Sequence, residues 1–285
     1  MALKINYNFQ SDFTHANMLK TEHNVNKNLE RLATGHRINR AADDAAGLYI
    51  ADQLKTFAVS LDQGTRNAQD GVSLAQIAQG SLEEVYNILN DIKAKTIQAA
   101  NDTNDDTNRK TIQQDINKLV DAIGKIFSDT EFNGRTIFSS GVQTFTIQYG
   151  GRTNQSLAIV SDTAQAAAGA NSAATSTVTI GGTAYTINVT GQTKANAAIS
   201  QVDALIKAVD RVAAKFGSAQ IELEKIISNN ETQRVNTNDA ESRIRNIDFA
   251  KEMAEFTKNN ILMQSGTAML AQANQQSQLV LQLLR

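Results

Sequence analysis

Proline is absent from all 285 residues of this chain. Average usage would give a chain of this length about 14 prolines. Proline breaks helix interiors because it lacks a backbone N–H donor and its ring clashes with the preceding turn. A chain without it can form very long helices, and such helices need partners to cover their apolar sides. The sequence therefore predicts long, thin helical packing.

The residue counts exclude several kinds of site and partner. With no cysteine there is no disulfide, thiol nucleophile or thiolate metal site. A net charge of -2 argues against a nucleic-acid partner. No run of apolar residues is long enough to span a membrane, and the first twenty residues do not resemble a secretory signal peptide. Composition alone would indicate a cytoplasmic protein.

Apolar residues recur at helical spacing along most of the chain. Ile112, Ile116, Leu119, Ile123 and Ile126 step by four and three, which is the heptad pattern of helices that pack side by side. The same rhythm occurs in 50–61, 82–92 and 199–227. Glycines 64, 71 and 80 fall between two of these runs, and we interpret them as tolerated within a helix, with close approach of another segment as the alternative.

Between the helical runs lies a segment with β character. Thr177–Ile180 and Thr183–Val189 alternate around Gly181-Gly182, which predicts a two-residue β-hairpin, and 145–149 predicts another strand. Residues 161–176 are small and polar and predict a surface loop. A last helix is expected from Glu241 almost to Arg285. The expected fold is mainly α: a long antiparallel helical hairpin or coiled-coil bundle with paired terminal helices and a small β-hairpin outer tip.

Both ends of the chain carry apolar residues on more than one side of a helix. A helix that is apolar all round belongs in a larger core, and the simplest source of that core is other copies of the chain. Docking of the terminal helix on its own domain is the alternative, and both stay open at this point. The candidate subunit-interface residues are Ile5, Phe9, Phe13, Met18, Val25, Leu29, Leu32, Met263, Leu270, Leu279, Val280, Leu281, Leu283 and Leu284.

Long segments near both ends resemble the signatures of bacterial flagellins. These are 30–47, 66–71 and 132–134 on the N-terminal side, and 242–248, 264–275 and 283–285 on the C-terminal side. The resemblance covers about 1–140 and 195–285. It implies a structural subunit, not an enzyme, that polymerises with itself into the flagellar filament for swimming motility.

The resemblance also implies a division into three parts. Residues 1–45 with 240–285 would form the inner tube, 46–140 with 194–239 the helical shell, and 141–193 the variable outer tip. It implies an extracellular filament protein exported without a cleaved signal peptide. The implied partners are the export apparatus, an export chaperone at the C-terminal helix, and the cap and hook-junction proteins.

One helix departs from the family pattern. Where many flagellins carry an arginine and a leucine that animal innate flagellin receptors contact, this chain has Asp91 and Lys95. The reversed charge and the lost apolar area predict weak or no activation of that receptor, although ordinary drift on a solvated face would look the same. The segment 93–100 resembles flagellins of the Helicobacter and Campylobacter type.

No motif indicates catalysis, a metal or a cofactor. His15, His23 and His36 show no ligand spacing, and Asp43-Asp44 is interpreted as capping the next helix or pairing with arginine. Two alternatives to the filament subunit stay open: a hook–filament junction protein and an intracellular coiled-coil adaptor.

Overall fold

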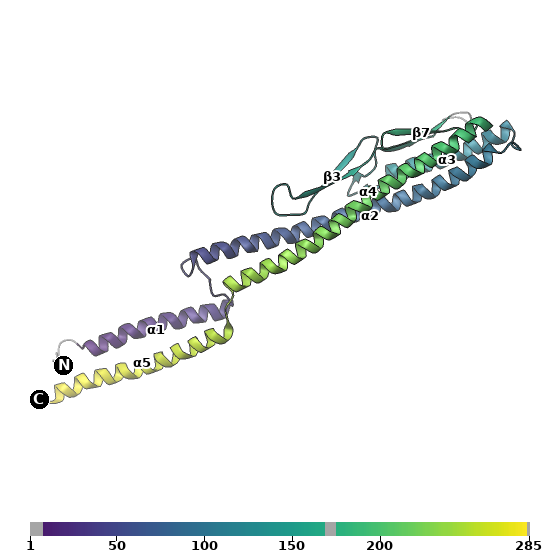
Figure 1. Ribbon diagram of the computed structural model, residues 1–285. Helices are drawn as coiled ribbons and strands as arrows, with labels where there is room; N and C mark the ends of the chain where they lie inside the picture. The colour runs from purple at the N-terminus through teal and green to yellow at the C-terminus, as the bar shows by residue number, and fades with distance from the viewer. Residues whose placement is uncertain (1–7, 169–174, 284–285) are drawn as a thin grey trace. The chain divides into compact units, whose positions relative to one another are not determined.

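The computed structural model describes residues 8–168 and 175–283, with side chains described up to residue 275. The chain forms two compact units: a terminal unit of Met1–Ala58 with Val235–Arg285, and a central unit of Val59–Arg234. The helices, shown in Figure 1, are α1 (Phe9–Thr34), α2 (Ala45–Ala100), α3 (Asp106–Asp129), α4 (Gln192–Arg245) and α5 (Phe249–Leu283). The mainly α fold with long helices is confirmed, and both α2 and α4 continue from one unit into the other.

The central unit is built around the heptad positions of three helices. Its core contains the apolar residues that step by three and four along α2, α3 and α4, and these are almost fully buried. Phe127, Phe138 and Phe216 pack in series at one level of this core, with ring centroids 5.4 and 6.0 Å apart. Other members of the core include Leu82, Val85, Leu89, Ile92, Ile112, Ile116, Ile123, Val202, Leu205, Val209 and Leu223.

In the part of the chain that the structure describes, seven short strands lie against these helices, and all of their pairings are antiparallel. β1 (Glu131–Phe132) pairs with β2 (Arg135–Thr136), and β3 (Gln143–Gln148) pairs with β4 (Ser156–Ser161). β5 (Ala164–Ala167), β6 (Ser176–Ile180) and β7 (Thr183–Ile187) form a three-stranded sheet in that order.

The expected hairpin around Gly181-Gly182 is confirmed. Both glycines have positive φ, 62° and 78°, as a two-residue type I′ turn requires. The prediction of a loop over 161–176 is wrong at Ala164–Ala167, which form β5. Ala166 of that strand lies close to Gly124 of α3, so the small residues that suggested a loop instead let a strand approach a helix.

The interpretation of the α2 glycines as merely tolerated is wrong at two of the three positions. A side chain at Gly64 would overlap the backbone carbonyl oxygen of Tyr149, and one at Gly71 would lie 2.9 Å from Leu223 Cδ1. Gly80 has open space beside it. The loop that joins β3 to β4 therefore lies directly on the backbone of α2, where Asn67 Nδ2 also donates to the Gln148 carbonyl at 2.8 Å.

The last helix begins later than the sequence suggested. α4 runs through Glu241 to Arg245, and α5 begins only at Phe249. Asp248 separates them, because its carboxylate accepts hydrogen bonds from the N–H groups of Ala250 and Lys251 and so caps α5. Asp105 caps α3 in the same way, by accepting from Asn108 N at 2.7 Å.

Candidate functional site

The terminal unit contains an antiparallel pair formed by α1 and α5. Their mutually facing positions are half-buried or buried and step by three and four along both helices, as in a coiled coil. Large apolar residues occupy only every second position on each helix. The seam consists of Ser11, Thr14, Met18, Thr21, Val25, Asn28 and Leu32 on α1, and of Glu252, Phe256, Asn259, Met263, Gly266, Leu270 and Ala273 on α5.

Polar contacts between the two helices show which of their residues face each other. Asn8 Nδ2 donates to the Ala273 carbonyl at 3.2 Å, and Ser11 Oγ donates to Asn274 Oδ1 at 3.1 Å. At the other end of the seam, the buried Asn28 amide is oriented so that both polar atoms have a partner: Nδ2 then donates to the Asn24 carbonyl at 2.8 Å, and Oδ1 accepts from Phe256 N at 3.1 Å.

An ion pair continues this polar group along the seam. Arg31 Nη1 lies 3.7 Å from Glu252 Oε1, one turn beyond Asn28 on α1. Glu252 is buried, although it is a carboxylate in the first turn of α5. A carboxylate at a helix N-terminus is favoured by the helix dipole, so the pair combines two stabilising effects.

The outer surfaces of the same two helices carry more large apolar side chains than the seam between them. Phe9 and Phe13 stack 6.1 Å apart and are 66% and 60% exposed. Among the described residues of the pair, the large apolar side chains that are exposed are Phe9, Phe13, Leu19, Leu29, Phe249, Met253, Ile261, Leu262 and Met269. The pairing of α1 with α5 within one chain therefore leaves these side chains uncovered.

The structure divides the interface residues proposed from the sequence into three groups. Phe9, Phe13 and Leu29 lie on the exposed surface. Met18, Val25, Leu32, Met263 and Leu270 lie in the seam and face the partner helix of the same chain. Ile5 and Leu284 lie outside the described residues, as do the side chains of Leu279, Val280, Leu281 and Leu283.

Six exposed apolar residues of the pair were not selected from the sequence. They are Leu19, Phe249, Met253, Ile261, Leu262 and Met269. Apolar residues occur on every side of α5. Periodicity alone therefore does not separate its seam residues from its surface residues. For Leu19 on α1 a signal exists, because the seven-residue spacing of Met18, Val25 and Leu32 identifies the side of α1 that faces α5.

The segments that adjoin α1 and α5 are hydrogen-bonded to each other and form a clamp, defined as Gly35–Arg37 with Arg245–Ile247. Arg37 N donates to the Arg245 carbonyl at 2.6 Å, and Ile247 N donates to the Gly35 carbonyl at 3.1 Å. His36 Nδ1 lies 3.1 Å from Asn246 Oδ1, so that ring nitrogen carries a hydrogen. Gly35 ends α1 with φ 72°, a left-handed conformation that favours glycine.

Asp43 and Asp44 have structural roles next to this clamp. Asp44 Oδ1 accepts from Gly47 N at 2.9 Å and caps the start of α2, as the sequence suggested. Asp43 pairs with Lys27 at 2.7 Å and not with an arginine. The hydrogen bond from Lys27 lowers the pKa of Asp43 from 3.8 to about 2, helped by the N–H groups of Arg40 and Asn39 and opposed by burial.

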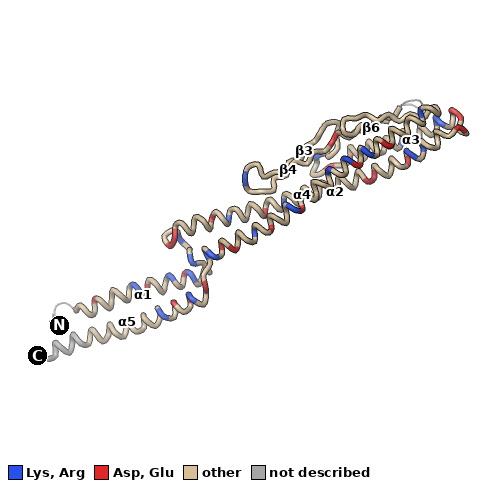
Figure 2. The backbone as a smooth tube through the Cα atoms, in the orientation of Figure 1, with Lys and Arg blue, Asp and Glu red and all other residues tan. Residues whose placement is uncertain are grey.

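Residues of both charge signs occur along the helices of the central unit (Figure 2), and some form ion pairs between neighbouring helices. Lys95 Nζ lies 3.0 Å from Asp115 Oδ2, and Lys93 Nζ lies 2.7 Å from Asp203 Oδ1. Asp91 is exposed on the same helix. Both lysines of this segment are therefore engaged with carboxylates of neighbouring helices.

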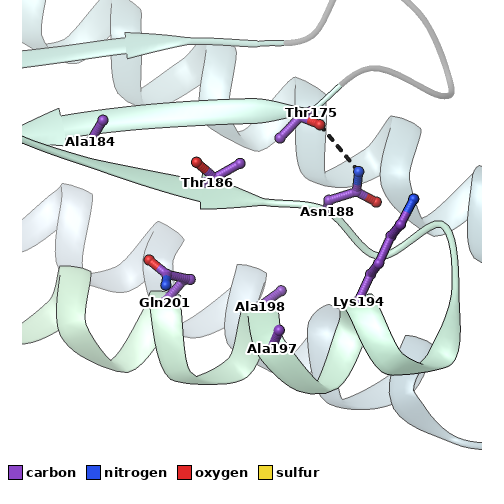
Figure 3. Close-up of a pocket in the computed structure, with 8 residues that line it drawn as sticks. All are labelled: Thr175, Ala184, Thr186, Asn188, Lys194, Ala197, Ala198 and Gln201. Atoms are coloured by element: carbon purple, nitrogen blue, oxygen red, sulfur yellow. Dashed lines mark hydrogen bonds between the residues drawn. The ribbon is translucent and has the colours of Figure 1, made fainter.

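A polar groove lies between the β6–β7 hairpin and the start of α4 (Figure 3). Lys194 and Gln201 line it from α4, and Thr186 and Asn188 line it from the hairpin side, where Asn188 Nδ2 donates to Thr175 Oγ1 at 3.1 Å. These side chains form no nucleophile–base arrangement. Within residues 8–168 and 175–283, no group of acidic, histidine or cysteine side chains has the arrangement of a metal site. No helix in that described part is long and apolar enough to cross a membrane.

Comparison with known proteins gives consistent matches at both ends of the chain. Residues 5–144 match the family described as the bacterial flagellin N-terminal helical region, and residues 199–284 match the bacterial flagellin C-terminal helical region. A flagellin of Halalkalibacterium halodurans is 38% identical over 281 residues, with 99% of both chains covered.

Two other relatives cover the chain equally well. A flagellin of Bacillus subtilis is 38% identical over 308 residues, with 99% of this chain and 100% of the relative covered. The flagellar filament 33 kDa core protein of Treponema phagedenis is 37% identical, with 99% of both chains covered. The narrower likeness to Helicobacter and Campylobacter flagellins finds no support in these relatives.

Proposed function

Because this chain belongs to the bacterial flagellin family and is a subunit of the flagellar filament, we propose that the exposed apolar surface of its terminal helix pair is what joins the subunits. The surface comprises the nine exposed apolar residues of α1 and α5 given above. The observation that carries this proposal is the placement of those residues on the outside of a helix pair whose seam is half polar.

The two sides of each helix differ in how much apolar surface a single chain buries. Fully burying one large apolar side chain stabilises by roughly 1.5–3 kcal/mol. On α1, three large apolar side chains lie in the seam, whereas four lie exposed on the outer surface. Polymerisation would remove that outer surface from water, so assembly would supply burial that a single chain lacks.

A filament requires heterologous contacts, in which an outer surface of one subunit meets a different surface of the next. A heterologous contact that does not close into a ring generates a helical polymer. In this arrangement 1–45 with 240–285 would form the inner tube, 46–140 with 194–239 the shell, and 141–193 the outer tip. The role is structural and requires no catalytic group or cofactor.

The test is polymerisation of purified chain after a single surface substitution. Phe13→Ser and Ile261→Ser are each expected to raise the critical concentration at least about tenfold, since each removes a side chain worth roughly 1.5–3 kcal/mol on burial. Val142→Ser is the matched control, because Val142 is equally exposed but lies in the central unit. Filaments that form at the parent concentration with either terminal variant would contradict the proposal.

Electron microscopy of the same samples separates a filament subunit from a junction protein. A filament subunit forms long filaments in bulk, whereas a hook–filament junction protein would form only short assemblies. The full-length coverage of flagellins from two genera, at 38% identity, supports the filament subunit.

We also propose the route to the filament on the basis of the family. The chain would leave the cell through the flagellar export apparatus without a cleaved signal peptide, with a chaperone on its C-terminal helix and with cap and hook-junction proteins as later partners. A chain without cysteine forms no disulfide, and one without proline has no slow prolyl isomerisation, so neither step would delay refolding after export.

Recognition by animal innate flagellin receptors is proposed to be weak or absent. Asp91 presents a negative charge, and the ammonium group of Lys95 is paired with Asp115. A cell reporter assay measures this directly. Asp91→Arg together with Lys95→Leu is expected to raise the response, and a potent response to the parent chain would contradict the proposal.

A further inference from the structure

The seam between α1 and α5 repeats every seven residues on both helices. On α1 the large apolar residues are Met18, Val25 and Leu32, and on α5 they are spaced in the same way. In the observed alignment each large side chain faces a small or polar one. Met18, for example, faces Gly266, where a Cβ atom would lie 3.9 Å from Met18 Cγ.

This repeat leaves the alignment of the two helices ambiguous on packing alone. If α1 slid by one heptad, about 10 Å along the axis, each large residue would again face a small or polar one. Met18 would then face Ala273 or, for a slide in the other direction, Asn259. A shift of that size would displace every outer apolar side chain of α1 relative to those of α5.

Asn28 distinguishes the observed alignment from the shifted ones. Asn28 is 4% exposed, and in the amide orientation that gives both polar atoms a partner, Nδ2 donates to the Asn24 carbonyl on its own helix and Oδ1 accepts from Phe256 N on the other. In the shifted alignments the Asn28 amide would face Met263 or Phe249, and its bond to Phe256 N would be lost. A buried polar group without its partner costs more than the bond contributes, so the amide disfavours those alignments.

The other polar contacts of the pair distinguish the observed alignment from the shifted ones less strongly. Asn8 and Ser11 lie in partly or fully exposed surroundings, where water replaces a lost bond. Arg31 and Glu252 are 3.7 Å apart, beyond hydrogen-bond length. The clamp is strong, but its backbone bonds do not depend on side-chain identity.

We infer that Asn28 is a positioning residue that, together with the clamp at Gly35–Arg37 and Arg245–Ile247, fixes the alignment of α1 against α5. A buried asparagine in a coiled-coil seam is an established means of fixing alignment at some cost in stability. The inference concerns pairing within one chain. It therefore holds or fails independently of polymerisation.

Because the natural sequence has no cysteine, paired cysteines report the alignment without background. Met18→Cys with Gly266→Cys reports the observed alignment after oxidation. Met18→Cys with Ala273→Cys, or with Asn259→Cys, reports the two shifted ones. Each reporter is placed in the full-length chain, and disulfide yield is measured in the soluble and in the sedimented fraction.

The reporters are combined with two perturbations and their controls. Asn28→Leu removes the amide from the seam, and Asn26→Leu adds the same side chain at an exposed position of the same helix. Ile247→Pro removes one N–H of the clamp, and Ile247→Ala keeps it. Circular dichroism verifies that each variant keeps its helix content.

The loss of the Asn28 amide and the loss of the Ile247 N–H are expected to act cooperatively. Each single perturbation is expected to change the ratio of shifted to observed disulfide less than about threefold, and the two together at least about tenfold, the size of effect that an unsatisfied buried amide produces. A double variant that keeps the parent ratio would overturn the inference. So would a tenfold change from Ile247→Pro alone, or a parent chain in which Met18→Cys with Gly266→Cys forms no disulfide. If no variant polymerises, the proposed function fails, and the disulfide ratios in the soluble fraction still decide the alignment.

Discussion

The central unit and the α1–α5 pair use the same heptad spacing in opposite ways. In the central unit the heptad positions are occupied by large apolar residues, and three helices and a layer of short strands bury them almost completely. In the α1–α5 pair half of the seam positions are small or polar, and large apolar residues lie outside. The comparison shows that heptad spacing specifies which side of a helix is paired, whereas residue size specifies whether that pairing is complete.

The largest expected difference between the two regions comes from truncating one phenylalanine in each. Phe216→Ala removes a ring that is 1% exposed in the central core and should lower the free energy of unfolding by about 3–5 kcal/mol. Phe13→Ala removes an exposed ring and should change it by less than about 0.5 kcal/mol in the soluble chain. Urea unfolding followed by circular dichroism measures both. Equal losses would mean that the terminal pair is already packed in the monomer.

A second prediction tests how tightly the central unit is closed. Gly64→Ala forces a methyl group against the Tyr149 carbonyl and should destabilise by about 1–3 kcal/mol. Gly80→Ala is the matched control on the same helix, where the open space should let alanine stabilise by about 0.5–1 kcal/mol. Opposite signs in thermal unfolding are the expected outcome. The same sign for both would show that the loop joining β3 and β4 yields to the added methyl.

The smallest predicted effect is the dependence of the terminal unit's stability on acidic pH. The pKa of Asp43 is lowered to about 2 by Lys27, so its contribution to stability is present above its ordinary pKa of 3.8. That contribution is lost as pH falls from about 4 to about 2. Asp43→Asn should flatten the pH dependence over this interval, as followed by amide exchange near the clamp. An unchanged profile would assign the acid response to other carboxylates.

The sequence predicted much of the fold because periodicity and turn chemistry are local. The heptads of 112–126 and 199–227 are core positions, and Gly181-Gly182 forms the turn expected of it. β5 was missed because its alanines owe their conformation to contact with α3 and not to their own propensity. Gly64 was misinterpreted for the same reason, since its neighbour is a loop more than eighty residues away.

The candidate site was predictable in kind but not residue by residue. Apolar residues at both ends indicated an unfinished surface, and Phe9, Phe13 and Leu29 lie on it. Met18 and Met263 lie in the seam instead, because an alignment between two distant helices decides which apolar residues face inward. No sequence pattern singles out Asn28, because its contribution to that alignment depends on a backbone N–H of the other helix.

The clamp also has a mechanical consequence. Any tension between the terminal helices and the rest of the chain acts on the two segments of the clamp, Gly35–Arg37 and Arg245–Ile247. Two backbone hydrogen bonds hold these segments together. A force applied to either terminal helix is thus shared by these two segments, because the hydrogen bonds between them must break before either segment is stretched alone. A rotating filament loads its subunits repeatedly, and here two hydrogen-bonded segments share a load that a single segment would otherwise carry alone.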